Sequence, residues 1–319
     1  MRSLSTPVLS QILSDFPAEA WSRLPAIAGS LRPKDSGSRM TTRLQERTEP
    51  AFPGIFSATH RDPEEKAIAS VPLYIGCAGW SLASSVQHNF PSQGTHLERY
   101  ARVFPAVEIN SSFYRPHRAA TYARWRDSVP DEFRFSVKMP QSITHRLRLK
   151  NAGVELLQFL GAVSNLKHKL GCVLVQLPPS LRFVPSIARN FFAELRSSVA
   201  ADIACEPRHA SWMGAEADEI FDALRIARIA ADPPAIPEST QTQIDTDTIY
   251  FRLHGAPVVY HSSYSDEYLN SLAVDLDSHA RLGRRVWCIL DNTASGAAIT
   301  NALFLVACLD MRMRFRMRN

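Results

Sequence analysis

Short apolar runs alternate with longer amphipathic stretches from Leu73 onward. Eight of these runs have the length and the apolar, β-branched character of buried strands. They cover residues 73–79, 106–112, 133–139, 172–178, 202–207, 228–233, 250–255 and 285–292. The stretches that follow them have helical spacing and cover residues 96–104, 119–127, 152–169, 185–198, 213–227, 265–282 and 295–309. This alternation predicts an α/β fold, a (β/α)8 TIM-like barrel, with an open doubly wound sheet as the alternative.

The two ends of the chain do not follow this pattern. Residues 1–70 are rich in Ser, Pro, Arg and Thr and predict an irregular or disordered N-terminal extension. The barrel is expected over residues 71–310. The last nine residues, 311–319, read MRMRFRMRN and predict a basic C-terminal tail.

Composition is that of a soluble globular protein, with 45% hydrophobic and 21% charged residues in 319. The apolar stretches are shorter than the roughly 18 residues that a membrane span needs, so no membrane partner is expected. The five cysteines are widely spaced and form no CxxC pair. They predict buried thiols in a reducing, cytoplasmic compartment rather than disulfides or a zinc site.

The net charge of +5 lies mostly at the C-terminus. Residues 1–70 carry 9 basic and 8 acidic side chains and the last nine carry 4 basic ones, which leaves 23 of each sign for the barrel. A neutral barrel gives no support for a large nucleic-acid footprint, although nucleic acid stays possible through the tail. The oligomeric state stays open.

Polar side chains gather where the predicted strands end, and a barrel brings these ends together on one face. The candidate catalytic residues are Glu108, Glu206, His145 and His254. The candidate substrate-binding residues are Trp80, Asn110, Tyr114, Lys138, Gln176, Arg208, His209, Trp212, Arg252 and Asn292. No metal ligand is assigned and the cofactor stays unknown.

Period-two spacing places Glu108 with Asn110, and Arg252 with His254, on the inward face of their strands. Each residue also has a structural interpretation: Glu108 can pair with Arg252 or Lys138, and a histidine can cap a loop. Burying so many charges costs several kcal/mol per ion unless they are paired, so their convergence predicts a functional pocket. The chain lacks GxGxxG after a strand, GxxxxGK[ST], GxSxG and HExxH, which disfavours nucleotide cofactors and common hydrolase mechanisms.

Seven ordered motifs resemble one known family. They are GCAGW, VEINSSFYRP, FRFSVKMPQSITH, VLVQLPPSLRF, EPRHASW, YFRLHG followed by YSDEYL, and DNTASGAAITNA. From about Leu73 to Leu309 the chain resembles the YecE-like family, domain of unknown function 72. The resemblance implies a TIM-like barrel, similar to that of endonuclease IV, and brings no established reaction. Cys77, Ala78 and Asp291 depart from the residues common in the family.

The function favoured by these residues is acid/base hydrolysis of a small substrate that carries a phosphate or carboxylate group. A glycosidase with Glu108 and Glu206 as paired carboxylates is a weaker relative. One alternative is a metal-dependent phosphodiesterase or endonuclease IV-like nucleic-acid hydrolase, with Glu108, Glu206, His209, His254 and Asp291 as ligands. The other alternative is a non-catalytic module that binds nucleic acid or a small anion.

Overall fold

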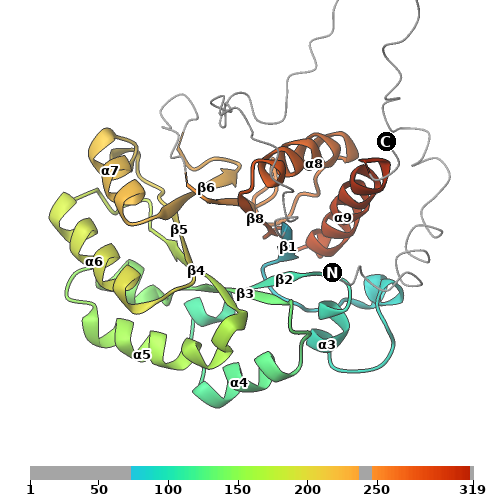
Figure 1. The fold of residues 1–319 in the computed structure, drawn as a ribbon, viewed down its shortest axis with the longest axis horizontal. Coiled ribbons are helices and arrows are strands. Elements are labelled where there is room, and N and C mark those ends of the chain that lie inside the picture. The colour runs from blue at the N-terminus through green and yellow to red at the C-terminus, as the bar shows by residue number, and fades with distance from the viewer. Residues whose placement is uncertain (1–72, 237–245, 317–319) are drawn as a thin grey trace, which may run out of the picture. The chain divides into compact units, whose positions relative to one another are not determined.

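Eight parallel strands form a nearly closed barrel, which confirms the predicted TIM-like fold (Figure 1). The structure is a computed structural model and describes residues 73–236 and 246–316. The predicted N-terminal extension, residues 1–70, lies outside the described residues. The strands are β1 (Leu73–Cys77), β2 (Ala106–Ile109), β3 (Arg134–Lys138), β4 (Leu170–Gln176), β5 (Asp202–Glu206), β6 (Ile226–Asp232), β7 (Thr248–Leu253) and β8 (Arg285–Leu290).

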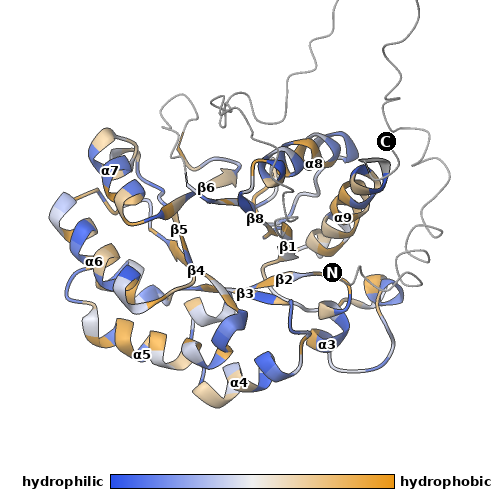
Figure 2. Ribbon diagram, viewed as in Figure 1, coloured by the Kyte–Doolittle hydropathy of each residue, from blue (hydrophilic) through white to orange (hydrophobic). Residues whose placement is uncertain are grey.

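Helices follow the strands and surround the sheet (Figure 1). The strands are mainly hydrophobic and the helices carry both hydrophobic and hydrophilic residues (Figure 2), as expected for one buried and one solvated helix face. The helices are α3 (His96–Ala101), α4 (Ala119–Asp127), α5 (Gly153–Val163), α6 (Pro185–Ser198), α7 (Ala215–Ala223), α8 (Asp266–Arg281) and α9 (Ala297–Arg316). No described helix is long and apolar enough to cross a membrane.

A tyrosine side chain joins the two end strands of the sheet. The hydrogen-bonded order runs from β1 through β8, β7, β6, β5, β4 and β3 to β2, so β1 and β2 share no ladder in the described sheet. Tyr100 of α3 lies between them: its hydroxyl accepts the Cys77 N–H at 2.8 Å and donates to the Ala106 carbonyl at 3.1 Å. Gly76 permits this approach, because a Cβ there would lie 2.1 Å from the Ala106 oxygen. The side chain of Tyr100 therefore closes the ring.

The barrel interior below the site is aromatic. Trp287 of β8 is fully buried and stacks on Tyr250 of β7, with ring centroids 5.9 Å apart. Gly171 makes room for the indole, since a Cβ there would lie 2.6 Å from a Trp287 ring carbon. Because Tyr250 also reaches upward with its hydroxyl, it links this apolar layer to the polar layer above.

Two predicted helices end earlier than their patterns indicate. The helix predicted for 213–227 ends at Ala223, and β6 already begins at Ile226, because Arg225 takes a left-handed conformation (φ 51°) that ends the helix. The helix predicted for 152–169 gives way after Val163 to a short helix, Ser164–Lys169, in which Lys167 has φ 53°.

The last helix is longer than its apolar pattern predicts. Helix α9 continues to Arg316, past Leu309, so residues 311–316 of the predicted tail are helical, and 317–319 lie outside the described residues. A contact with α8 accompanies this extension, with Arg312 Nε 3.6 Å from a carboxylate oxygen of the buried Asp277. The five cysteines are free and buried, as predicted.

Candidate functional site

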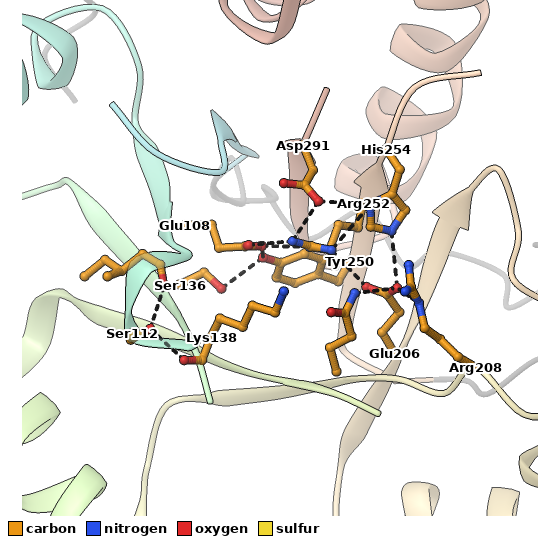
Figure 3. Close-up of polar contacts among 12 residues, drawn as sticks. Glu108, Ser112, Ser136, Lys138, Glu206, Arg208, Tyr250, Arg252, His254 and Asp291 are labelled. Atoms are coloured by element: carbon orange, nitrogen blue, oxygen red, sulfur yellow. Dashed lines mark hydrogen bonds and ion pairs between the residues drawn. The ribbon is translucent and has the colours of Figure 1, made fainter. Parts of the chain in front are cut away.

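Three charged side chains from different strands meet inside the upper barrel. Glu108 of β2, Glu206 of β5 and Arg252 of β7 are each at most 1% exposed. Their positions follow from strand parity: Glu108 has the same orientation as the inward-facing Ala106, and Arg252 the same as Tyr250. The predicted convergence of these residues is therefore present in the fold (Figure 3).

Arg252 is the centre of the cluster. Its Nε and Nη2 donate to the two oxygens of Glu108 at 3.0 and 2.8 Å, a bidentate pair. Its Nη1 donates to Glu206 at 3.2 Å, and Nη2 lies 3.0 Å from Asp291. One guanidinium thus compensates three buried carboxylates, and these carboxylates hold its pKa high although burial acts to lower it. We call the following six residues the Arg252 network: Glu108, Glu206, Tyr250, Arg252, His254 and Asp291.

Glu206 has four hydrogen-bond donors. Oε1 accepts from Gln176 at 2.9 Å, Arg208 at 3.0 Å and His254 at 3.2 Å, while Oε2 accepts from Arg252. Burial acts to raise the pKa of Glu206, but Arg252, His254 and Arg208 outweigh it and hold the pKa well below its usual range. A carboxylate with this many donors is a poor proton acceptor at neutral pH.

His254 faces a carboxylate on each side. Nδ1 lies 3.0 Å from Asp291 and Nε2 lies 3.2 Å from Glu206. A neutral imidazole has one N–H, whereas the imidazolium donates from both nitrogens. Burial acts to lower the pKa of His254, and the bonds to Asp291 and Glu206 overcome it and raise the pKa. The two flanking carboxylates therefore favour the imidazolium form of His254.

Tyr250 belongs to the network, although it is not among the site residues predicted from the sequence. Its hydroxyl donates to Glu108 at 3.2 Å and lies 2.9 Å from the Ser136 hydroxyl of β3. The signal was in the sequence, since Tyr250, Arg252 and His254 alternate with apolar residues along one strand. Asp291 is predicted from the sequence only as a ligand in the metal-dependent alternative. Arg252 and His254 lower the pKa of Asp291, although burial acts to raise it.

Lys138 differs from every charged residue of the network. It extends from the end of β3 toward the network (Figure 3) and is 5% exposed. Its Nζ lies 4.3 Å from the centre of the Phe113 ring, and among the described residues no carboxylate lies within 4 Å of it. Burial, and then the charge of Arg252, lowers the pKa of Lys138 to about 8. The site thus contains a buried amine without a carboxylate partner.

His145 also contacts the Phe113 ring. It belongs to a π-helical turn, Ser142–Arg146, and its ring centre is 5.0 Å from that of Phe113. Nδ1 lies 2.8 Å from the Thr144 hydroxyl, which donates to the Pro140 carbonyl at 3.3 Å. This favours the tautomer with the proton on Nδ1 and a basic Nε2. Burial, with Lys138, Arg208 and Arg148, lowers the pKa of His145.

Arg208 reaches the network from the loop after β5. Its Nε is bound to Glu206, and the side chain is 25% exposed. Among the described residues its Nη atoms have no hydrogen-bond partner. A partly exposed group of side chains therefore lies beside the network. We call it the Phe113 rim, and it consists of Phe113, Lys138, His145 and Arg208.

Three further candidates lie at the strand ends without joining the network. Trp80 packs edge-on against Trp125 of α4, with centroids 5.0 Å apart. Tyr114 is 68% exposed and touches Phe113. Asn110 follows β2, and its buried Oδ1 has no hydrogen-bond partner in the described part of the chain.

The remaining candidates have structural partners. His209 Nδ1 accepts the Ser211 N–H at 3.1 Å and caps a short helix, Ala210–Trp212. Trp212 is buried and donates to the Leu181 carbonyl at 2.9 Å. Asn292 is buried and donates to the Ser262 carbonyl, also at 2.9 Å. These contacts hold loops in place, and the geometry does not bring the three residues to the network.

The ligand set of the metal alternative does not fit a cation. Oxygens of Glu108, Glu206 and Asp291 lie 2.8 to 3.2 Å from the Arg252 guanidinium, which occupies the position between them. His209 is used in its cap. The described residues contain no cluster of three or more His, Cys, Asp or Glu with metal-site geometry. No step of a mechanism is therefore assigned to a metal.

Comparison with known proteins gives the family. A family model described as "Protein of unknown function DUF72" matches residues 74–317, three quarters of the chain. The chain belongs to the DUF72 family. The predicted YecE-like resemblance is confirmed by the DUF72 match and by two curated relatives that are named UPF0759 proteins.

These relatives differ in how much of them is matched. The UPF0759 protein YecE of Escherichia coli K12 is 35% identical over 106 residues, which span only 38% of YecE and 33% of this chain. The UPF0759 protein YunF of Bacillus subtilis strain 168 is 25% identical over 272 residues, covering 95% of YunF and 75% of this chain.

Solved DUF72 structures share the barrel. A DUF72 family protein of Thermotoga maritima MSB8 has a TM-score of 0.63 at 26% identity, covering 75% of this chain and 99% of its own. A DUF72 protein of Enterococcus faecalis V583 also has a TM-score of 0.63, at 19% identity, which shows the fold alone. The names of these DUF72 proteins state no substrate and no reaction.

Proposed function

We propose that the protein is an enzyme that binds a small substrate through its phosphate or carboxylate group at the carboxyl-terminal end of the barrel strands and hydrolyses it by acid/base chemistry. The observation that carries the proposal is that the charges of the Arg252 network are paired with one another, whereas the charge of Lys138 has no carboxylate partner. Every carboxylate of the network is bound to Arg252, whereas the Lys138 ammonium has a ring face and no carboxylate within 4 Å. A substrate anion would supply the missing partner.

The proposal divides the roles between two regions. Lys138 and the Nη atoms of Arg208 hold the anion, because both present donors that described residues do not use. His145 is the general base: burial lowers its pKa, and Nε2 takes a proton from a water whose oxygen bonds to the phosphorus or carbonyl carbon as the ester bond to the alcohol oxygen breaks. The imidazolium then returns this proton to the departing alcohol oxygen. Glu108 and Glu206 position the guanidinium and are not the base, since their oxygens are already occupied by donors.

The anion site is tested by chemical labelling of lysines. Acetylation followed by mass spectrometry should label Lys138 with a midpoint near pH 8, below the value of about 10.4 for an ordinary lysine. Inorganic phosphate should protect Lys138, with no protection of the exposed Lys167, which serves as the control. Equal protection of both lysines, or of neither, would contradict the proposed site.

Turnover separates an enzyme from a binding module. The saturated network also suits recognition without chemistry, because none of its carboxylates is free to move a proton. A His145→Gln variant should lose about 10²- to 10⁴-fold in hydrolysis of phosphate and carboxylate esters while phosphate still protects its Lys138. Protection without turnover of any ester by the unmodified protein would favour the non-catalytic module.

A further inference from the structure

A pocket lined by basic and apolar residues lies outside the Arg252 network. It is a pocket of about 190 Å³ between the turn that follows residue 146, the loop after β4, and the start of α6. Its lining includes three basic side chains, a serine, a buried tryptophan and aliphatic residues from α6. The residues that the argument uses are Arg148, Lys150, Ser180, Arg182 and Trp212.

The positive charge of this pocket is not compensated. No Asp or Glu lines it. Arg148 donates to the Ser180 hydroxyl at 3.0 Å and the Ser180 carbonyl at 2.7 Å, both neutral acceptors. In the described residues none of Arg148, Lys150 and Arg182 has a carboxylate within 4 Å, whereas Arg285 elsewhere on the barrel is paired with Asp202 at 2.7 Å.

The backbone that carries two of these cations is held in an uncommon conformation. Arg148, Leu149 and Asn151 have φ of 54°, 66° and 49°. Non-glycine residues in this region cost about 1 kcal/mol or more each and persist where the surroundings fix them. The Leu149 N–H bond to the Ile143 carbonyl (3.1 Å) and the Arg148 bonds to Ser180 provide that fixation. The turn therefore holds Arg148 and Lys150 at the pocket wall.

The pocket is connected to the Phe113 rim through two neighbouring loops. The Phe183 N–H donates to the Ser211 hydroxyl at 2.8 Å, and Trp212 donates to the Leu181 carbonyl, which joins the loop after β4 to the loop that carries Arg208. On the other side, Arg148 lies two residues after the π-helical turn, Ser142–Arg146, that contains His145. Neighbouring loops thus carry the cations of the rim and those of the pocket.

We propose that this pocket binds a second anionic group of the substrate, so that the substrate is a small molecule with two phosphate or carboxylate groups. This inference rests on the proposed function. One anion lies at Lys138 and Arg208, and the other lies among Arg148, Lys150 and Arg182. Arginine forks recognise such groups by bidentate hydrogen bonds.

The test uses inorganic phosphate and a series of linear alkyl α,ω-bisphosphates of increasing length as probes, measured by titration calorimetry at one ionic strength. At one spacer length the bisphosphate should bind about tenfold or more tightly than phosphate, because the second group then binds intramolecularly. The double variant Lys150→Glu, Arg182→Glu should lose this gain and keep the binding of phosphate at the rim. Both side chains are exposed, so the fold should tolerate the change.

Two controls make the outcomes distinct. Arg189→Glu changes an exposed arginine of α6 that does not line the pocket, and it should keep the gain. Lys138→Met should abolish phosphate binding at the rim. If the bisphosphate binds no more tightly than phosphate at any spacer length, or if its higher affinity survives in the double variant, the second subsite is overturned and the proposed function is unaffected. Phosphate affinity that is the same with and without Lys138→Met, in the Lys150→Glu, Arg182→Glu background, overturns the proposed function and, with it, the two-anion substrate.

Discussion

The Arg252 network and the Phe113 rim lie at the same end of one barrel and differ in whether their charged side chains have oppositely charged partners. In the network, every carboxylate has a cationic donor, and burial makes each of these bonds difficult to replace. At the rim, Lys138 is buried against a ring and Arg208 is partly solvated with Nη atoms that no described residue binds. The difference indicates that the network fixes geometry and the rim is left ready for a ligand.

Removal of the network's centre should have the largest effect. Arg252→Met leaves the carboxylates of Glu108, Glu206 and Asp291 without their shared partner, and we expect a loss of about 3–5 kcal/mol in the free energy of unfolding. Urea denaturation at pH 7 measures it. Arg208→Met is the matched control: it removes one donor from Glu206 at a solvated position and should cost about 1 kcal/mol. A smaller loss for Arg252→Met than for the control would contradict an ionised network.

A substitution at the rim should instead raise the free energy of unfolding. Lys138→Met removes a buried cation without a carboxylate partner and should stabilise the protein by about 3 kcal/mol at pH 7, from the shift of its pKa to about 8. Because the folded protein binds this proton more weakly than the unfolded chain, the unmodified protein gains stability as pH rises from about 8 to 10.5. The advantage of the variant should therefore be gone near pH 10.5. Denaturant midpoints at pH 7 and 10 check this; a destabilised variant would mean that the ammonium has a partner.

His254 should give a smaller effect that depends on pH. Its raised folded pKa means that its stabilisation is complete below the unfolded value of about 6.5 and is lost as pH rises through the folded pKa. His254→Gln should cost about 2 kcal/mol at pH 6, where it loses a charged bond, and less at higher pH. Unfolding curves at pH 6 and 9 measure the difference. A cost that grows with pH would indicate a neutral histidine.

His145 should have the smallest effect on stability. Its ring is partly exposed and its hydrogen bond is to the adjacent Thr144, so His145→Gln should change the free energy of unfolding by less than about 0.5 kcal/mol. Thermal or urea unfolding beside the turnover assay separates the two roles. A large loss of stability would place His145 with the network rather than with the rim.

Much of the barrel was predictable because each strand is an apolar run whose polar end is visible in the sequence. The same parity put Glu108, Arg252 and His254 on the inner face, and it would also have found Tyr250. The helix end at Ala223 was not predictable, since it depends on a positive φ at Arg225. The change to a short helix after Val163 was not predictable either, because the sequence there remains helix-forming.

The division between network and rim could not be derived from residue types. Glu108 and Arg252 are separated by 144 positions, and only their orientation shows that both carboxylate oxygens are already bound. The motif EPRHASW contains Glu206, Arg208, His209 and Trp212 side by side, yet local turns direct the first two to the network and the last two to the loop and the core. Hydrogen-bond saturation is a property of three-dimensional neighbours.

The tyrosine that closes the ring protects the two edges of the sheet. Strands β1 and β2 have no ladder between them in the described sheet, and the hydroxyl of Tyr100 supplies the bridge from a helix that lies between them in sequence. Closure of the ring therefore depends on the packing of α3 beside these two strands. Without that bridge, β1 and β2 would present two open sheet edges, which are the surfaces through which chains pair wrongly with one another. One short helix thus protects both edges of the sheet.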